Sequence, residues 1–406
     1  MLQLRQEHAP LAATLLVGAL AATLSCNALA AEGRGQRYSP GVGGSDMTAP
    51  LSPGWYGQVA MLHYHATKLK DARGNEVGTV AAGSNAPTAA VVSTLPGAAQ
   101  GPATASLNAA GYRGIGYNAR VSHFRADAYV MLPRVTYLST KQLFGANIGF
   151  TAMLPLVERQ TAISAATSIT AANAQTLQAA LTPVIGPTNA AAVASGASAN
   201  VLSGASAEVN RQMAARTGSN AGIGDLEMSP VLRWEIGDNQ AAIFTPTVIF
   251  PTGEYDKDLA VNPGFGNFYT FRPSVQYAFI GDGWDVGARL VLSFNTRNKD
   301  TKYRSGNMLN VDFQAMKFVS EDLRLGLQGY VVQQFTKDSS EIAVDQAMID
   351  AADGNKMRAY ALGPAVAWIK DGGDLLLEGK VLREFGARNR AEGTAFWLML
   401  SKPFGL

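Results

Sequence analysis

The sequence predicts an all-β fold, a transmembrane antiparallel β-barrel of about twelve strands. Short polar turns alternate with long polar loops from about Gly54 to the end of the chain. The runs between them are roughly ten residues long and alternate apolar with polar residues, as barrel strands do. The composition is balanced, with a mean hydropathy of +0.03 and a formal net charge of +2. Such a balance suits strands in which only alternate residues meet lipid.

Two kinds of connection alternate along the chain, so every second connection should lie on the same side of the barrel. In outer-membrane barrels the tight turns face the periplasm and the longer loops lie outside. The predicted short turns are at 140–142, 237–239, 281–283, 320–322 and 371–373. The predicted long loops are at about 71–115, 158–222, 251–267, 296–306, 336–356 and 386–392.

The strands themselves are supported by period-two alternation. In the run 285–295, Val286 and Leu290 share one face, whereas Asp285 and Arg289 share the other. An even number of strands would place both chain ends in the periplasm, and ten or fourteen strands are the alternatives to twelve. The runs begin near residues 54, 117, 144, 224, 240, 269, 285, 307, 323, 357, 374 and 394.

A soluble β-sandwich would also alternate, but here the polar faces carry charges of both signs on consecutive strands. In a barrel those charges would point into a wet lumen as a ladder across the pore. Bulky charged side chains in a barrel of this size would leave a narrow channel. The predicted lumen-lining residues are Arg125, Asp127, Asp225, Glu227, Arg233, Arg272, Asp285, Arg289, Asp312, Arg324, Glu378 and Lys380.

The tryptophans give an independent indication of sidedness. All five fall toward the predicted periplasmic end of a strand, where an aromatic girdle is expected at the membrane interface. The alternative is chance placement of core residues. The positions are Trp55, Trp234, Trp284, Trp368 and Trp397.

The N-terminus is predicted to be a signal peptide covering residues 1–30. Arg5 precedes an apolar run from Leu11 to Leu24, and Ala28-Leu29-Ala30 provides a small-x-small cleavage site. Lipidation at Cys26 is the weaker alternative. With ordinary cleavage the mature chain contains no cysteine, so it needs no disulfide. The segment 31–53 would then be either a periplasmic leader or a hatch in the lumen, with the barrel spanning 54–406.

Two long loops have unusual compositions. The loop 71–115 is rich in Ala, Gly, Ser and Pro and is predicted to be irregular. The loop 158–222 is dominated by Ala, and its runs 163–181 and 189–215 could form an extracellular helical hairpin interrupted near Pro183 and Pro187. A disordered, low-complexity insertion is the alternative.

No arrangement of residues predicts catalysis, a cofactor or a metal. His63, His65 and His123 could meet on adjacent strands as metal ligands, but polar or interface-facing positions are the favoured interpretation. Asp256, Asp258 and Asn262 could bind calcium weakly, but they lack the spacing of an EF-hand loop. Neither a Gly-x-Ser-x-Gly motif nor a phosphate loop occurs. The absence of a basic stripe argues against nucleic-acid binding.

Five motifs, in order, resemble the "meta-pathway of phenol degradation" family. The resemblance covers most of the mature chain outside the two Ala-rich loops, and it departs from the family at 158–222 and after Phe404. The motifs are Gly41-Val42-Gly43-Gly44-Ser45-Asp46 with Pro53-Gly54; Gly222-Ile223-Gly224-Asp225-Leu226 with Pro230 and Trp234; Pro251-Thr252-Gly253-Glu254-Tyr255-Asp256 with Asn262-Pro263-Gly264; Asn295 with Thr301-Lys302-Tyr303-Arg304-Ser305-Gly306; and Gln333-Gln334 with Asp338.

The resemblance implies an outer-membrane barrel of a Gram-negative bacterium, associated with catabolism of aromatic or other hydrophobic compounds, and it carries over no catalytic residue. We therefore expect a monomeric channel for passive uptake of small hydrophobic or aromatic molecules. Its expected partners are that ligand, outer-membrane lipid and lipopolysaccharide. A structural or adhesive barrel with an external binding loop is the alternative, and an outer-membrane enzyme is a third, weaker one.

Overall fold

The computed structural model describes residues 36–48, 52–370 and 374–404. The predicted signal peptide, its cleavage site, Cys26 and residues 31–35 lie outside the described residues. The described chain forms two compact units. One contains residues 77–123 and 163–215, and the other contains the remaining described residues from 36 onward.

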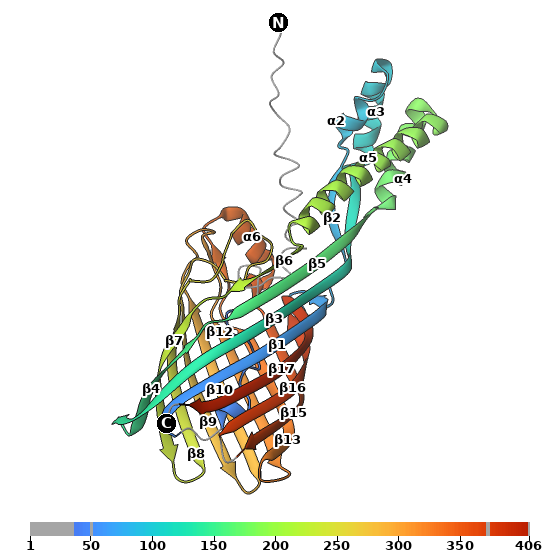
Figure 1. Ribbon diagram of the computed structural model, residues 1–406. Coiled ribbons are helices and arrows are strands. Elements are labelled where there is room, and N and C mark those ends of the chain that lie inside the picture. The colour runs from blue at the N-terminus through green and yellow to red at the C-terminus, as the bar shows by residue number, and fades with distance from the viewer. Residues whose placement is uncertain (1–35, 49–51, 371–373, 405–406) are drawn as a thin grey trace. The chain divides into compact units, whose positions relative to one another are not determined.

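The larger unit is a closed antiparallel barrel of twelve strands, so the predicted fold class is confirmed (Figure 1). The barrel closes because β1 pairs with β17 on one side and with β3 on the other. The twelve strands are β1 (Gly54–Lys70), β3 (Ile115–Leu143), β4 (Ala146–Met153), β7 (Glu227–Ile236), β8 (Gln240–Ile249), β9 (Thr270–Gly281), β10 (Trp284–Asn295), β12 (Met308–Phe318), β13 (Leu323–Gln334), β15 (Arg358–Lys370), β16 (Leu375–Arg388) and β17 (Arg390–Phe404).

Two predicted connections are wrong in detail. The strand β3 continues through 140–142, and the turn to β4 is made by Phe144 and Gly145, both with positive φ. The predicted long loop at 386–392 does not exist, because β16 and β17 are joined by Asn389 alone, at φ 50°. Asn tolerates this left-handed conformation better than most residues, which permits so tight a connection. The predicted turn at 371–373 lies outside the described residues.

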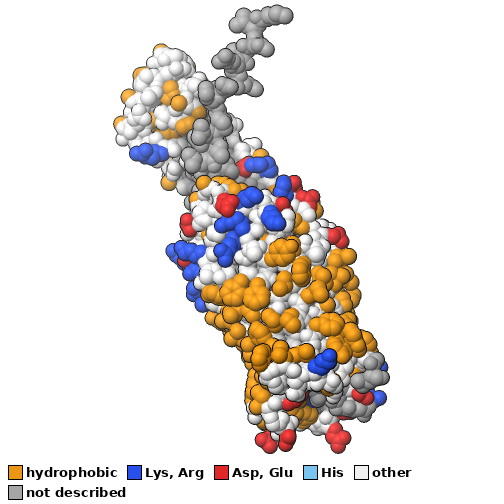
Figure 2. Space-filling model, turned by 90° about the vertical axis from the view of Figure 1, so that its left-hand side faces the viewer, with side chains coloured by type: hydrophobic (Ala, Val, Ile, Leu, Met, Phe, Trp, Pro, Cys, Tyr) orange, Lys and Arg blue, Asp and Glu red, His pale blue; other side chains and the backbone are white. Residues whose placement is uncertain are grey.

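The strands present one face to the lumen and one outward. On β10, Asp285, Arg289 and Val291 are buried inside, whereas Val286 and Leu290 are exposed on the outer wall. Figure 2 shows the outer face, where apolar side chains form a band between charged side chains. An apolar band of this kind is the lipid-facing surface of an outer-membrane barrel.

The tryptophans lie on both faces. Trp55, Trp234, Trp284 and Trp368 are on the outward side of their strands, and Trp55 packs on Tyr137 with ring centroids 4.9 Å apart. Trp397 is instead buried on the inner face of β17, so its assignment to the aromatic girdle is wrong. It alternates with Phe396 and Leu398, which take the outward positions.

The wall is locally interrupted next to β4 and β7. The strand β4 gives way to β5 (Leu156–Ile169) across Leu154 and Pro155, and β6 (Gly218–Ile223) gives way to β7 across residues 224–226. A hydrogen bond of 2.7 Å from the Gly224 N–H to the Pro155 carbonyl joins the two breaks. Other loops of this unit carry a small sheet of β11 (Tyr303–Arg304) and β14 (Ser339–Ser340), the helix α6 (Ala343–Ala351), and the short helix η2 (Asp353–Asn355).

The smaller unit contains most of the two Ala-rich loops. The prediction that the loop 71–115 is irregular is wrong. It forms β2 (Thr79–Asn85), α2 (Thr88–Val92) and α3 (Gly97–Ala109). In the second loop α4 (Ala171–Ile185) and α5 (Pro187–Ala214) form a helical hairpin, turned at Gly186 with φ 81°. Its apolar contacts involve Leu177 and Val209, both fully buried. In the part of the chain that the structure describes, no helix is long and apolar enough to cross a membrane.

Candidate functional site: a lumen filled by the N-terminal segment

Ten of the predicted lumen residues are buried at inward positions of the barrel unit. Asp225 precedes β7, and the others lie on the strands themselves. They are Asp225, Glu227, Arg233, Arg272, Asp285, Arg289, Asp312, Arg324, Glu378 and Lys380. Most form pairs of opposite charge: Glu227 with Arg272, Asp285 with Arg324, Glu378 with Lys380, and Arg233 with Glu235.

The remaining two, Arg125 and Asp127, lie on the outward face of β3, so their assignment to the lumen is wrong. Asp127 is the direct cross-strand neighbour of His65, whose Nδ1 lies 2.7 Å from its carboxylate. His63 Nε2 lies 3.9 Å from the same carboxylate and its ring stacks on Tyr129. Arg125 donates to Asp127 from two positions earlier on the strand.

His63 and His65 thus belong to an outer-wall cluster with Arg125, Asp127 and Tyr129. Among the described residues, no group of three or more His, Cys, Asp or Glu side chains could hold a metal ion. In the loop after β8, Asn262 instead exchanges hydrogen bonds with the backbone of Asp256, at 2.8 Å each.

Residues 36–48, here called the lumen segment, contact the inner faces of the barrel strands. Asp312 on β12 is one anchor for this segment. Its carboxylate accepts hydrogen bonds from the hydroxyl of Tyr38 at 2.5 Å, the N–H of Gly41 at 2.9 Å and the N–H of Gly43 at 2.8 Å. Hydrogen bonds to a charged acceptor are among the stronger ones in proteins.

A second anchor lies on β16. The N–H of Ser45 donates to Glu378 at 2.7 Å, and the ammonium group of Lys380 donates to the carbonyl of Gly43 at 2.8 Å. The backbone here approaches the wall so closely that a Cβ atom at Gly44 would clash with Glu378 and Lys380. Gly41, at φ +83°, is equally confined, because a Cβ there would lie 2.8 Å from Leu382.

A third anchor is the carboxylate of Asp46, within the short helix η1 (Ser45–Met47). It lies 2.8 Å from Nη2 of Arg134 on β3 and 3.1 Å from Nη2 of Arg289 on β10. Burial raises the pKa of Asp46, but the two guanidinium groups outweigh burial and lower the pKa to about 2. Asp46 therefore remains ionised and paired over the whole physiological pH range.

Arg37 fixes the other end of the lumen segment. It donates to Asp225 at 3.0 Å and to the carbonyls of Phe268 and Gly266, and its guanidinium lies 3.8 Å from the centroid of the Phe268 ring. Asp225 also accepts the N–H of Gly253 at 3.0 Å. This anchor therefore joins the lumen segment to the loop between β8 and β9.

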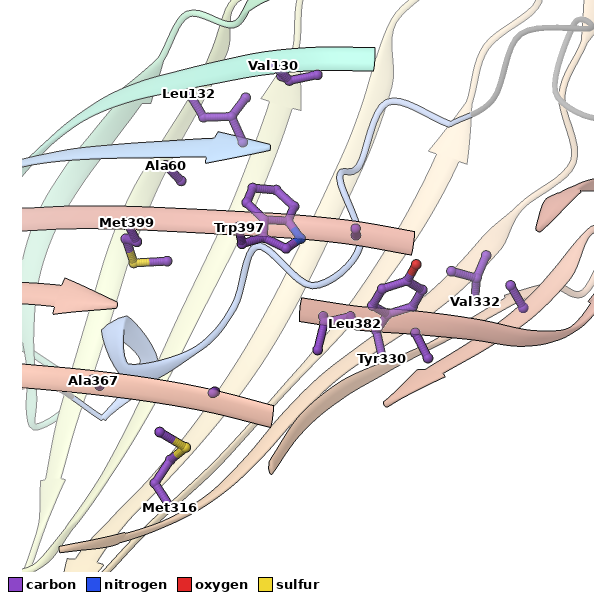
Figure 3. Packing of buried hydrophobic residues seen from close by; sticks show 14 of the residues in the cluster. Ala60, Val130, Leu132, Met316, Tyr330, Val332, Ala367, Leu382, Trp397 and Met399 are labelled. Atoms are coloured by element: carbon purple, nitrogen blue, oxygen red, sulfur yellow. The ribbon is translucent and has the colours of Figure 1, made fainter. Parts of the chain in front are cut away.

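The inner wall also has an apolar part. Its buried side chains come largely from β1, β3, β15, β16 and β17, and they include Leu132, Leu382, Trp397 and Met399. Figure 3 shows Trp397 pointing from β17 into this cluster, close to the lumen segment. A Cβ atom at Gly41 would lie 3.2 Å from its indole nitrogen.

Two cavities flank the lumen segment. The first, of about 180 Å³, lies between this segment and strands β3, β4, β7, β8 and β9. The second, of about 220 Å³, is bounded by β1, β3, β17 and the loop at 260–262. Both are lined by Gln36, Tyr38, Ser39, Val130 and Arg159, so they adjoin each other.

The sequence reasoning missed Arg37, Tyr38, Arg134 and Gln276 as site residues. The Gly41 to Gly44 pattern did indicate a tight path, and the alternation Val130, Leu132, Arg134 could have indicated the inner face of β3. The partners of these residues follow from register and packing, since Arg134 and Asp46 are far apart in sequence.

The closed barrel, its outward apolar band and its charged interior define this chain as an outer-membrane β-barrel protein. The family model "Putative MetA-pathway of phenol degradation" matches residues 96–400, and the chain belongs to that family. No curated protein matches it in sequence.

Solved structures resemble it at low sequence identity. An outer membrane channel from Pseudomonas putida F1 has a TM-score of 0.55 at 13% identity, covering 91% of this chain and 100% of that one, and it supports the fold. A Pseudomonas aeruginosa FadL homologue has a TM-score of 0.33 at 10% identity, covering 87% and 91%. The P. putida toluene transporter TodX has a TM-score of 0.32 at 11% identity, covering 90% and 95%.

Proposed function

We propose that this protein is a monomeric outer-membrane channel for passive uptake of small hydrophobic or aromatic molecules, and not an enzyme. The observation that carries the proposal is the pair of adjoining cavities beside the lumen segment, with linings that are partly apolar. Membership of a family linked to phenol degradation supports an aromatic ligand. The long loops would face the outside and the short turns the periplasm.

The sizes of the cavities fit single-ring molecules. An apolar cavity of roughly 150 Å³ is enough to take benzene in a protein interior. The two cavities here measure about 180 and 220 Å³, so each has room for one ring. A solute could pass from one to the other along Tyr38 and Arg159, which line both.

The lumen segment acts as a hatch in this proposal. The anchors at Asp312, Glu378, Asp46 and Asp225 hold it across the lumen, so large hydrophilic solutes are excluded. Without the segment, these carboxylates would lose their hydrogen-bond partners in the segment and would be hydrated instead. Uptake therefore requires local rearrangement of the hatch or of the wall, and it needs no energy source.

The test is flux into liposomes that contain the purified protein. We expect toluene, phenol and benzyl alcohol to enter faster than into protein-free liposomes, and mono- and disaccharides to be excluded. Deleting residues 31–48 should admit the sugars and raise conductance in planar bilayers. Equal aromatic flux with and without protein would refute the channel function, whereas unchanged conductance after deletion would refute the hatch alone.

The sidedness and partners can be tested separately. Cysteines introduced at the exposed positions Asn239 and Ala199 should be labelled from opposite sides of the membrane by an impermeant maleimide. The outer wall would contact membrane lipid and lipopolysaccharide through its exposed apolar band. A single species of monomer mass in detergent, measured by light scattering, is the expected oligomeric state.

A further inference from the structure

The first cavity carries more positive than negative charge. Its lining contains five arginines but only three carboxylates, those of Asp46, Asp225 and Glu227. Two of the carboxylates are each bound by one arginine, Asp225 by Arg37 and Glu227 by Arg272. The third, Asp46, is shared by Arg134 and Arg289. Arg289 also lies directly across from Asp312 on β12, whereas the cross-strand neighbours of Arg134 are Gln58 and Met153. Of the two guanidinium groups on Asp46, Arg289 therefore has a second carboxylate beside it and Arg134 shares Asp46 alone.

Arg134 is the accessible member of this group. Its side chain is 26% exposed although it lies on the inner wall, whereas that of Arg289 is 11% exposed and also donates to Gln276. Within the described residues, the side chain of Arg134 makes one hydrogen bond, from Nη2 to the carboxylate of Asp46. The guanidinium group has further N–H donors. Arg134 is one of the residues that line the first cavity.

The lining also has an apolar part. Leu132, Ile249 and Val291 are among the side chains that bound the same cavity. A ring could pack there while an anionic group on the ring reaches Arg134. The planar guanidinium matches a carboxylate in geometry and can bind it through two parallel hydrogen bonds.

We propose that the first cavity is a binding site for a single-ring aromatic carboxylate, with the carboxylate on Arg134 and the ring against the apolar lining. This inference rests on the proposed uptake function and narrows its substrate class. A guanidinium group that shares one carboxylate and has further N–H donors favours an anionic ligand over an equally large neutral one.

Binding at this site would also weaken the hatch. The ligand's carboxylate would compete with that of Asp46 for Arg134, and Asp46 belongs to the lumen segment. The anchors at Asp312 and Glu378 would remain in place. By linkage, a ligand that loosens the segment binds more tightly when the segment is already loose.

The second cavity serves as an internal comparison. Its lining is mostly apolar or aromatic, including Tyr64, Phe124 and Tyr330. Its Arg390 is bound to Glu384 at 2.7 Å, so that charge is compensated. We expect this cavity to accept neutral rings as readily as anionic ones.

The experiment measures binding of benzoate, benzyl alcohol and acetate to the purified full-length mature protein by calorimetry at neutral pH. Benzoate should bind about tenfold more tightly than benzyl alcohol, as one charge-assisted contact allows, and acetate should bind weakly because it has no ring. Arg134→Met should remove the preference for benzoate while benzyl alcohol binding persists. Arg73→Met, a change at an exposed loop residue, should alter neither.

Arg134→Lys keeps the positive charge but cannot form two parallel hydrogen bonds with a carboxylate. This variant should therefore bind benzoate more weakly than the wild type but more tightly than Arg134→Met. Heat-modifiable electrophoretic mobility would establish that each variant is folded. Equal affinity for benzoate and benzyl alcohol in the wild type would overturn the inference, as would an equal loss of both in Arg134→Met. Benzyl alcohol flux without benzoate binding would refute this site alone, whereas absence of flux for every aromatic would refute the uptake function.

Discussion

The N–H of Ser45 donates a hydrogen bond of 2.7 Å to the carboxylate of Glu378 on β16. This contact is possible because Gly44, the preceding residue, has no side chain between the lumen segment and the wall. This anchor of the segment therefore depends on one glycine and one carboxylate that lie far apart in sequence.

Replacing Gly44 by Val should dislodge the lumen segment. The new Cβ would clash with the charged ends of Glu378 and Lys380, so both buried side chains would have to shift and their hydrogen bonds to the lumen segment would be disturbed. We expect a several-fold increase in single-channel conductance and faster trypsin cleavage after Arg37. Gly196→Val is the matched control, because a Cβ at Gly196 in α5 meets nothing within 4 Å. A closed, protease-resistant Gly44→Val barrel would contradict this role of the glycine.

Replacing Asp312 by Ala should release the middle of the segment. Three donors, Tyr38, Gly41 and Gly43, would lose their common acceptor. The loss should weaken retention of the segment by on the order of 3 kcal/mol, since hydrogen bonds to charged groups contribute about 1.5 kcal/mol or more each and not all of this is additive. Conductance noise and trypsin sensitivity should rise. Asp350→Ala, on the exposed side of α6, should leave both unchanged.

Acid should loosen the segment through Asp46. Its pKa is about 2 in the folded protein and 3.8 when free, so it contributes stability that is complete above pH 3.8 and is lost as the pH falls through about 2. The contribution is on the order of 2 kcal/mol. Wild-type conductance should rise between pH 4 and pH 2. Asp46→Asn should already be more conductive at pH 7 and change less over the same interval.

The outer-wall cluster should affect stability without affecting uptake. Asp127→Asn removes the charged partner of His65 and Arg125, and both partners are partly exposed. We expect a loss of about 1 kcal/mol in the free energy of unfolding, measured by denaturant titration in detergent, with normal aromatic flux. Asp238→Asn in an exposed turn is the control. A flux defect in Asp127→Asn would show that the cluster is linked to the lumen.

The barrel could be predicted because its strands alternate between two chemically different surfaces. On β10 the charges of Asp285 and Arg289 face the lumen and Leu290 faces lipid, so the phase of the strand is evident from the residues alone. The hairpin α4–α5 could be predicted on different grounds, since Ala favours helix strongly, but residues 163–169 of the first predicted helix belong to β5.

The phase of β3 could not be obtained in this way. The inner wall next to it is itself apolar, so Val130 and Leu132 inside resemble Met131 and Val135 outside. Hydrophobicity then no longer separates the two faces, which is why the prediction for Arg125 and Asp127 is wrong. The prediction for Trp397 fails on the same side of the barrel, where an aromatic side chain packs inward against the lumen segment.

The lumen segment directly precedes β1, the strand whose pairing with β17 and β3 closes the barrel. Only a few residues separate Thr48 from Gly54. The short connection keeps the segment beside the closing strand, so its hydrogen bonds to the wall can form while the barrel closes. Assembly by this route never requires Asp46 and Arg37 to be drawn afterwards through a finished pore.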